Sequence, residues 1–181
     1  MNAVLSDTTL KTLNATLFSD ETNNIYAVLD GASIPLLRDK LYEHDPEYVC
    51  LYAGDLEPDM EEVAPYLVRL ERDSPFCHWV LSEGWGNHWG VFVSTEEDLR
   101  TLRKHFRTFL LVQDPEGKTL YFRYYDPRVL RVYLPTCNDD EAQAVFGPVQ
   151  WYVMESEEEG ELIRFRPDRE GARQESVQLA T

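Results

Sequence analysis

The sequence has few positive charges, few lysines and no long apolar segment. Only 17 lysine and arginine residues stand against 33 aspartate and glutamate residues, which gives a net charge of −16. Such an excess of negative charge repels phosphate backbones and anionic bilayers, so we expect neither nucleic acid nor a membrane as a partner. No apolar run approaches the roughly 18 residues that a membrane-spanning helix needs.

Cysteine is scarce, and its spacing does not suggest disulfide bonds. Cys50, Cys77 and Cys137 are an odd number at irregular intervals, each within or beside an apolar run. This pattern is typical of reduced thiols in a cytoplasmic protein. Residues 1–18 contain no basic segment followed by a long apolar stretch, so no signal peptide is expected. We therefore expect a cytoplasmic location.

What the sequence does contain is enough apolar material for one folded domain. Its 181 residues are 43% hydrophobic and 12% aromatic, which excludes an intrinsically disordered chain. We divide it into an N-terminal arm, a main domain, a short C-terminal helix and strand extension, and a disordered tail that lacks apolar periodicity. These parts are residues 1–20, 21–135, 136–166 and 167–181.

Periodicity and turn signals give a set of expected elements. Strands are predicted at residues 25–30, 48–52, 65–70, 91–93, 109–113, 118–125, 149–154 and 161–166. Helices are predicted at residues 34–43, 75–82, 95–107, 127–134 and 139–145, and the arm forms either a short helix or a loose segment. Strands that alternate with helices and then form a hairpin predict an α/β (mixed α+β) fold, in which helices cover a mixed sheet.

The most informative segment is the predicted corner between the strand at 118–125 and the helix that follows it. Proline cannot donate to a ladder, so Pro127 ends the strand, and Asp126 is a good N-cap for the helix. Arg123, Tyr125 and Arg128 surround this aspartate. The corner is therefore either a rigid structural brace or a surface that recognises a partner.

The helix predicted at 95–107 carries arginines beside its apolar stripe. We expect Ser94 and Glu97 to form a capping box at its start. At 100° per residue, Arg103 and Arg107 flank the apolar stripe rather than lying opposite it. Arginines at the edge of a core need carboxylate or carbonyl partners. Asp126 could clamp Arg103 or Arg123, and Glu96 could pair with Arg100; the alternative is direct binding of a partner.

The cysteines, histidines and tryptophans also permit catalytic and sugar-binding interpretations, for which simpler structural explanations exist. Cys77 precedes His78, but adjacent residues point in different directions, so a buried thiol is favoured over a nucleophile–base pair. The four histidines show no metal-ligand spacing, and no cofactor is expected. Trp85 and Trp89 lie in a glycine-rich turn, where they either plug the core or form an aromatic platform for a partner or a sugar. A hydrolase that uses Cys77 or a carboxylate, and a carbohydrate-binding module, are the alternative functions.

An ordered series of motifs resembles one protein family. The motifs are residues 26–31 (Tyr-Ala-Val-Leu-Asp-Gly), 64–68 (Ala-Pro-Tyr-Leu-Val), the glycine- and tryptophan-rich turn 84–90, residues 102–107, and the final 122–128 (Phe-Arg-Tyr-Tyr-Asp-Pro-Arg). Together they resemble the effector adaptor, or chaperone, family of bacterial type VI secretion, first catalogued as a domain of unknown function. The resemblance covers residues 25–134.

The resemblance implies a protein that binds another protein and is not an enzyme. Members of this family hold a toxic effector, often through the N-terminal region of the effector, and help to load it onto the VgrG spike. Many members carry a sizeable helical extension, whereas only 53 residues follow Arg128 here. The expected partners are accordingly an effector and VgrG. The resemblance leaves the contact surface open. From the residues themselves, the candidates for partner binding or structural bracing are Arg103, Arg107, Arg123, Asp126 and Arg128, and the candidate aromatic anchors are Trp85, Trp89 and Tyr125.

Overall fold

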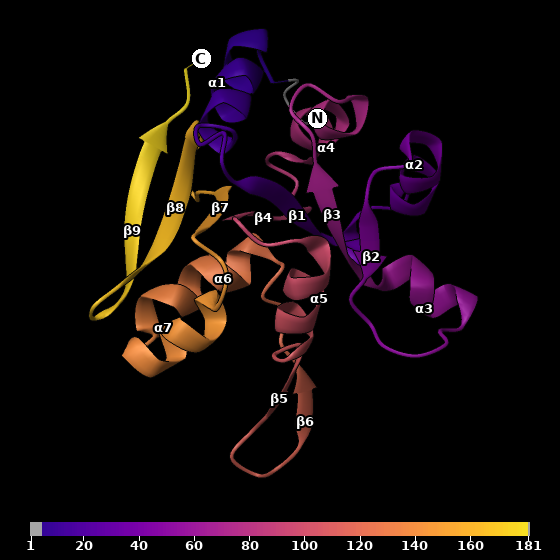
Figure 1. Cartoon of the computed structure of the whole chain (residues 1–181), viewed down its shortest axis with the longest axis vertical. Helices are drawn as coiled ribbons and strands as arrows, with labels where there is room; N and C mark the ends of the chain where they lie inside the picture. Colours follow the sequence, from indigo (N-terminus) through magenta and orange to yellow (C-terminus); the bar gives the residue numbers. More distant parts are fainter. Residues whose placement is uncertain (1–4, 181) are drawn as a thin grey trace.

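The computed structural model describes residues 5–180 and is built around one large sheet. Its seven strands lie in the order β2-β3-β1-β4-β7-β8-β9, and a separate β5–β6 hairpin projects away from the sheet (Figure 1). The strands are β1 (Asn24–Asp30), β2 (Tyr48–Cys50), β3 (Pro65–Leu70), β4 (Gly90–Thr95), β5 (Leu111–Gln113), β6 (Thr119–Tyr121), β7 (Trp151–Glu155), β8 (Glu161–Asp168) and β9 (Gly171–Gln178). The predicted α+β class is confirmed. A mixed sheet was expected, and all the ladders observed are antiparallel.

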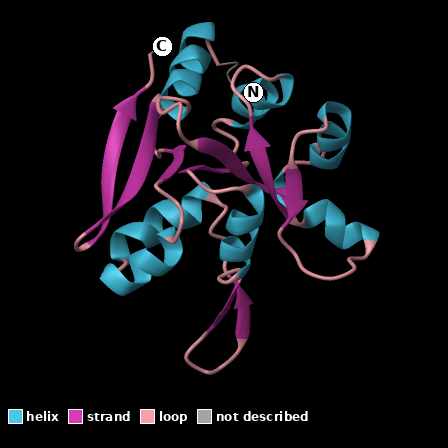
Figure 2. Ribbon diagram, viewed as in Figure 1, coloured by secondary structure: helices cyan, strands magenta, loops and turns pink. Residues whose placement is uncertain are grey.

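Helices cover both faces of the large sheet (Figure 2). They are α1 (Asp7–Leu17), α2 (Leu37–His44), α3 (Pro58–Val63), α4 (Pro75–Gly84), α5 (Leu99–Arg107), α6 (Pro127–Tyr133) and α7 (Asp139–Phe146), with short 3₁₀ turns η1 (Gly31–Ser33) and η2 (Leu134–Thr136). The core on one face is formed with α5, α6 and α7, and the core on the other with α1, α2 and α4. None of the helices within residues 5–180 is long and apolar enough to cross a bilayer.

Strand β1 lies at the centre of the sheet and serves both cores. It pairs with β3 on one side and with β4 on the other, and its residues from Ile25 to Asp30 are all buried. Because side chains alternate along a strand, Tyr26 and Val28 enter one core while Ala27 and Leu29 enter the other. Because both of its faces are buried, the strand has a nearly continuous apolar sequence instead of an alternating one.

The core beneath α5 is built mainly from stacked rings. Phe106, at the end of α5, is fully buried and stacks on Tyr124 with ring centroids 5.4 Å apart and planes 12° apart. Its ring also contacts those of Phe109 and Tyr152. These contacts hold the segment that follows the β5–β6 hairpin against the sheet.

Helix α5 begins later than predicted, at Leu99. Its N-cap is Asp98, whose carboxylate accepts a hydrogen bond of 2.8 Å from the Thr101 N–H, and the expected capping box of Ser94 and Glu97 is not formed. The reason is that β4 continues through Thr95, which pairs with Asn24 of β1. Ladder hydrogen bonds on a central strand outweigh a local capping signal.

Other differences arise at the ends of the main domain. Strand β6 stops at Tyr121, short of the predicted 125, because residues 122–126 turn into the core. Helix α3 was not predicted from the sequence.

Residues 171–178 were predicted to lie in a disordered tail, yet they form β9, which pairs with β8 along its length. Leu179 is buried and extends the core beyond that strand.

The stacked core under α5 makes a direct prediction for stability. Replacing Phe106 with alanine removes a fully buried ring and leaves a cavity, so the free energy of unfolding should fall by about 3–5 kcal/mol. Urea denaturation followed by circular dichroism would measure this. The control, Val132→Ala, removes a side chain that is 62% exposed and should change stability by less than about 0.5 kcal/mol. Equal effects from the two substitutions would contradict this description of the core.

Candidate functional site

The predicted corner contains a buried aspartate that sequence reasoning did not assign to it. Asp30, at the end of β1, is 1% exposed, and its carboxylate accepts hydrogen bonds from the Ala32 N–H at 3.2 Å and the Ser33 hydroxyl at 2.6 Å. Arg123 donates to the same carboxylate through Nη2 at 2.5 Å. Burial opposes the charge of Arg123, but Asp30 more than compensates and raises the pKa of the guanidinium. Arg123 therefore ties the segment before α6 to the central strand.

Asp126 is the second acidic group at the corner and caps α6 as predicted. Its carboxylate accepts a hydrogen bond from the Arg128 N–H at 3.0 Å. The Arg128 guanidinium binds it in a forked geometry, with Nε at 3.0 Å and Nη2 at 2.8 Å. Arg123 lies 4.0 Å from the same carboxylate. Although burial acts to raise the pKa of Asp126, the hydrogen bonds from Arg128 outweigh it and lower that pKa.

The paired groups leave part of each arginine at the surface. The side chains of Arg123 and Arg128 are 45% and 51% exposed, whereas those of Asp30 and Asp126 are 2% and 6% exposed. Within residues 5–180 neither Arg103 nor Arg100 forms an ion pair, so the proposed clamp of Arg103 by Asp126 and the pairing of Arg100 with Glu96 are wrong. The two carboxylates are fully engaged with Arg123 and Arg128.

Arg107 braces the neighbouring edge of the sheet. Its guanidinium donates to three consecutive carbonyl oxygens at the end of β2: Cys50 at 3.0 Å, Leu51 at 3.0 Å and Tyr52 at 2.8 Å. Burial, together with the charge of Arg103, lowers the pKa of Arg107. Carbonyl oxygens satisfy the donors without neutralising the positive charge, so the cation is held in place with its full charge.

Tyr125 faces the interior and is not an exposed anchor. It is only 3% exposed, and burial raises the pKa of its hydroxyl. The nearby Tyr52 hydroxyl contributes to that shift, and the Arg123 guanidinium lies 5.9 Å from the centre of the Tyr125 ring. Tyr125 therefore supports the arginine from below, and only the arginine reaches the surface.

The tryptophan-bearing turn is a packed part of the core. The ring centroids of Trp89 and Trp79 are 4.8 Å apart, and Trp85 stacks on Phe92 with ring centroids 6.2 Å apart. A Cβ at Gly90 would lie 2.2 Å from the Val28 carbonyl oxygen, so the turn needs glycine where it meets β1. Trp85 and Trp89 are both half-buried, and they line a small enclosed gap with Glu155. The interpretation as a core plug fits this geometry better than an open aromatic platform.

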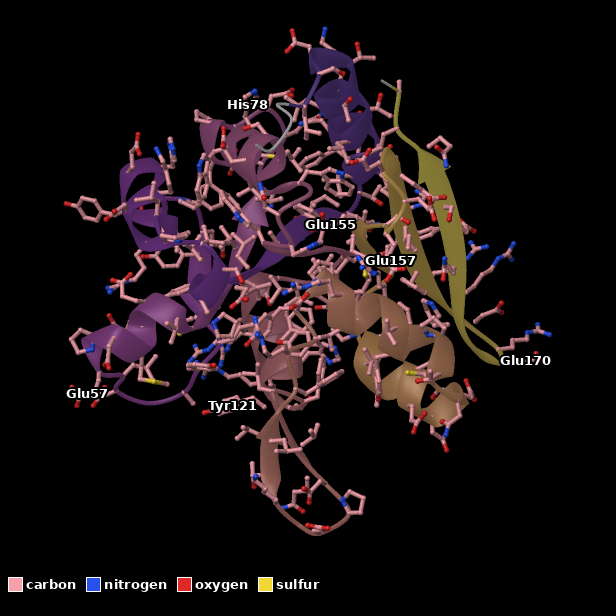
Figure 3. All side chains as sticks on the ribbon, turned by 180° about the vertical axis from the view of Figure 1, so that it is seen from behind. Glu57, His78, Tyr121, Glu155, Glu157 and Glu170 are labelled. Carbon is pink, nitrogen blue, oxygen red and sulfur yellow. The ribbon has the colours of Figure 1, made fainter. Side chains whose placement is uncertain are left out.

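A histidine–carboxylate pair that the sequence did not reveal holds the same turn. The Nδ1 atom of His88 lies 3.0 Å from Oε1 of Glu155, at the end of β7. Glu155 is labelled in Figure 3. Its side chain belongs to a residue that is 6% exposed, and burial raises its pKa. No local signal could have identified this contact, because 67 residues separate the two groups.

The chemistry of Cys77 does not favour a nucleophile. The thiol is fully buried in α4, and burial raises its pKa to about 12. Such a thiol is protonated at neutral pH, whereas catalytic thiols have lowered pKa values. Within residues 5–180 no group of three or more histidine, cysteine, aspartate or glutamate side chains is arranged to hold a metal ion.

Because Arg123 is the cation that pairs with the buried carboxylate of Asp30, its removal should lower the stability of the protein strongly. Arg123→Ala deprives buried Asp30 of its cation, so the free energy of unfolding should fall by about 1–3 kcal/mol. The control Arg69→Ala breaks a pair whose side chains are 43% and 53% exposed, and it should cost less than about 1 kcal/mol. Urea denaturation would compare them, and a smaller loss for Arg123→Ala would show that the corner is no brace.

The lowered pKa of Asp126 predicts a pH dependence of stability. A carboxylate with a lowered folded-state pKa stabilises the fold fully above its unfolded pKa of about 4, and this contribution disappears as pH falls through the folded value. The stability difference between wild type and Asp126→Asn should be constant from pH 7 to 5 and shrink below pH 4. Urea titrations at each pH would measure it, and a constant difference down to pH 3 would contradict the assignment.

Comparisons with known proteins identify a family without assigning an activity. Comparison with curated proteins and with solved structures gave no significant match. One family, described as a domain of unknown function (DUF4123), matches residues 25–144. The matched region runs from β1 to α7 and includes Asp30, Arg107 and the whole corner around Asp126. The chain therefore belongs to the DUF4123 family.

Proposed function

We propose that this protein is an adaptor that binds a cognate type VI secretion effector and promotes its loading onto the VgrG spike. The proposal has two parts, which rest on different observations. Protein binding is supported by the surface of the described residues. The identities of the effector and the spike are supported by the resemblance of residues 25–134, which overlaps the family match over residues 25–144.

The observation that carries the proposal is the distribution of exposed large apolar side chains. Of the ten among residues 5–180, five lie between positions 36 and 63 and four lie on the β5–β6 hairpin. Single exposed apolar residues are normal, but grouped ones mark interaction sites. The groups are Leu36, Tyr42, Tyr48, Met60 and Val63, and Leu111, Val112, Leu120 and Tyr121.

The corner around Asp126 supports this function because it holds two partly exposed arginines in fixed positions. Arg123 and Arg128 are held by buried carboxylates, and their outward parts remain exposed. Fixing a cation before binding reduces the entropy that a partner must remove, which favours specific recognition. The arginines therefore act as braces, and the exposed parts of their guanidinium groups are available as fixed hydrogen-bond donors for a protein partner.

The two alternative functions have less support. A hydrolase that uses Cys77 would need a reactive thiol, and burial raises the pKa of this one to about 12. A carbohydrate-binding module would need open indole faces, and Trp85 and Trp89 are packed against Phe92 and Trp79. The environment of Cys77 therefore does not favour a hydrolase, and the packing of the two tryptophans does not favour a carbohydrate-binding module.

The test is capture of the effector. The full chain and the toxin encoded beside its gene should copurify after co-expression, and the complex should then bind the VgrG encoded in the same cluster. Cys77→Ser should capture the toxin as well as wild type does, because a buried thiol has no part in a surface contact. Failure of wild type to retain either protein, or turnover of a substrate that Cys77→Ser abolishes, would overturn the proposal.

A further inference from the structure

Helix α5 carries positive charge that the other residues of the described range 5–180 do not neutralise through ion pairs. Nine of the 17 lysine and arginine side chains pair with a carboxylate of the described residues. Acidic residues outnumber basic ones by 33 to 17, so carboxylates are the more abundant partner in this sequence. Four of the eight cations without such a pair lie on this one helix: Arg100, Arg103, Lys104 and Arg107.

The positive charge extends into the neighbouring hairpin. Residues 99–123, which include α5 and the hairpin, contain six basic and two acidic residues and have a net charge of +4. Residues 36–63 contain nine acidic and two basic residues and have a net charge of −7. The charge of the protein is therefore strongly polarised, and α5 with the hairpin is opposite in sign to the molecule as a whole.

A series of contacts joins the cations to the exposed apolar side chains. Arg103 and Arg107 lie one turn apart on α5 and therefore share a face of the helix. The Arg107 guanidinium donates to the Tyr52 carbonyl oxygen at 2.8 Å. The Tyr52 ring lies 5.6 Å from the ring of Tyr121, which Figure 3 shows at the base of the hairpin. Tyr121 pairs across the hairpin with Leu111. These five residues form what we call the α5–hairpin surface.

The apolar part of this surface is open. Tyr121 is 59% exposed and Leu111 is 52% exposed, although each faces the other in the β5–β6 ladder. Within residues 5–180, β5 and β6 pair only with each other, so the outer edges of the hairpin also present free backbone groups. The hairpin stands away from the body, where a second chain has access to it (Figure 1).

We propose that the α5–hairpin surface binds a segment of the effector in which acidic side chains accompany apolar ones. The carboxylates of that segment would pair with Arg103 and Arg107, and its apolar side chains would cover Tyr121 and Leu111. Charge complementarity favours this partner over a basic one, because two adjacent cations without carboxylates repel a third. The inference rests on the proposed function and assigns its contact surface.

The acidic region at residues 36–63 is a weaker candidate. Its exposed apolar side chains would suit a basic segment, but its own cations are already paired, Arg38 with Glu61 and Glu62 at 2.8 Å and Lys40 with Glu43 at 2.6 Å. Acidic residues are abundant throughout this sequence, so a local excess of them carries little information. By contrast, α5 alone holds four of the eight cations that form no carboxylate pair within residues 5–180.

The test compares matched variants of the full chain. Arg103→Glu and Tyr121→Ser should each weaken capture of the neighbouring toxin at least tenfold, because each removes a central contact of the interface. The control Arg72→Glu makes the same charge change at an exposed arginine outside α5 that forms no ion pair within residues 5–180. The control Val132→Ser removes an apolar side chain that is 62% exposed and belongs to neither group of exposed apolar residues. Both controls should retain capture within twofold, and circular dichroism should show that all four variants fold.

A second measurement uses defined peptides and does not require the toxin. Wild type is titrated with a 16-residue peptide of alternating glutamate and leucine, and with the same peptide carrying lysine in place of glutamate, while backbone amide signals are followed by NMR. The acidic peptide should shift the signals of residues 99–123, and Arg103→Glu should reduce those shifts. Preferential binding of the lysine peptide, or shifts confined to residues 36–63, would overturn the inference.

The two arms separate failure of the inference from failure of the proposed function. If wild type captures the toxin and Arg103→Glu captures it equally well, the adaptor function stands and the assigned surface is wrong. If wild type captures no toxin while the acidic peptide binds residues 99–123, the surface stands and the proposed effector function is wrong. If neither the toxin nor the acidic peptide binds, both are wrong.

Discussion

The buried carboxylate of Asp30 joins the end of the central strand β1 to the segment that precedes α6. It ends the central strand β1, which pairs with β3 and β4, and it binds Arg123 from a segment 93 residues away. A charge at 1% exposure must be fully partnered, and the Ala32 amide, the Ser33 hydroxyl and Arg123 meet that need. The path of the chain between the hairpin and α6 is therefore fixed by an electrostatic requirement of the sheet.

The same contact links the core to the surface. With Arg123 held by Asp30, residues 124 and 125 turn inward, so Tyr124 stacks on Phe106 and Tyr125 reaches Tyr52. Arg107 fixes the end of β2 close by. The protruding hairpin thus stands on a rigid base of rings and paired arginines, and a binding surface that is already ordered loses little entropy when a partner docks.

The charge distribution gives this surface its specificity. A net charge of −16 would suggest that any partner should be basic, and that inference from composition treats the molecule as one uniform field. The local charge differs along the chain: residues 36–63, which include α2 and α3, carry a net charge of −7, whereas residues 99–123, which include α5 and the hairpin, carry +4. Close contacts respond to the local charge, so the sign of the whole molecule does not decide what binds at α5.

Elements whose signals lie within a few residues of each other could be predicted from the sequence. Buried β1 reads as an apolar run, the hairpin is marked by its Asp-Pro-Glu-Gly turn, and Asp126 caps α6 because capping involves neighbours in the chain. Tertiary structure decided the rest: that Arg123 pairs with Asp30 and not with Asp126 alone, that His88 meets Glu155, that Tyr125 is buried, and that β9 completes the sheet. Each of these contacts joins groups far apart in sequence or depends on burial, and neither local propensity nor spacing specifies such contacts.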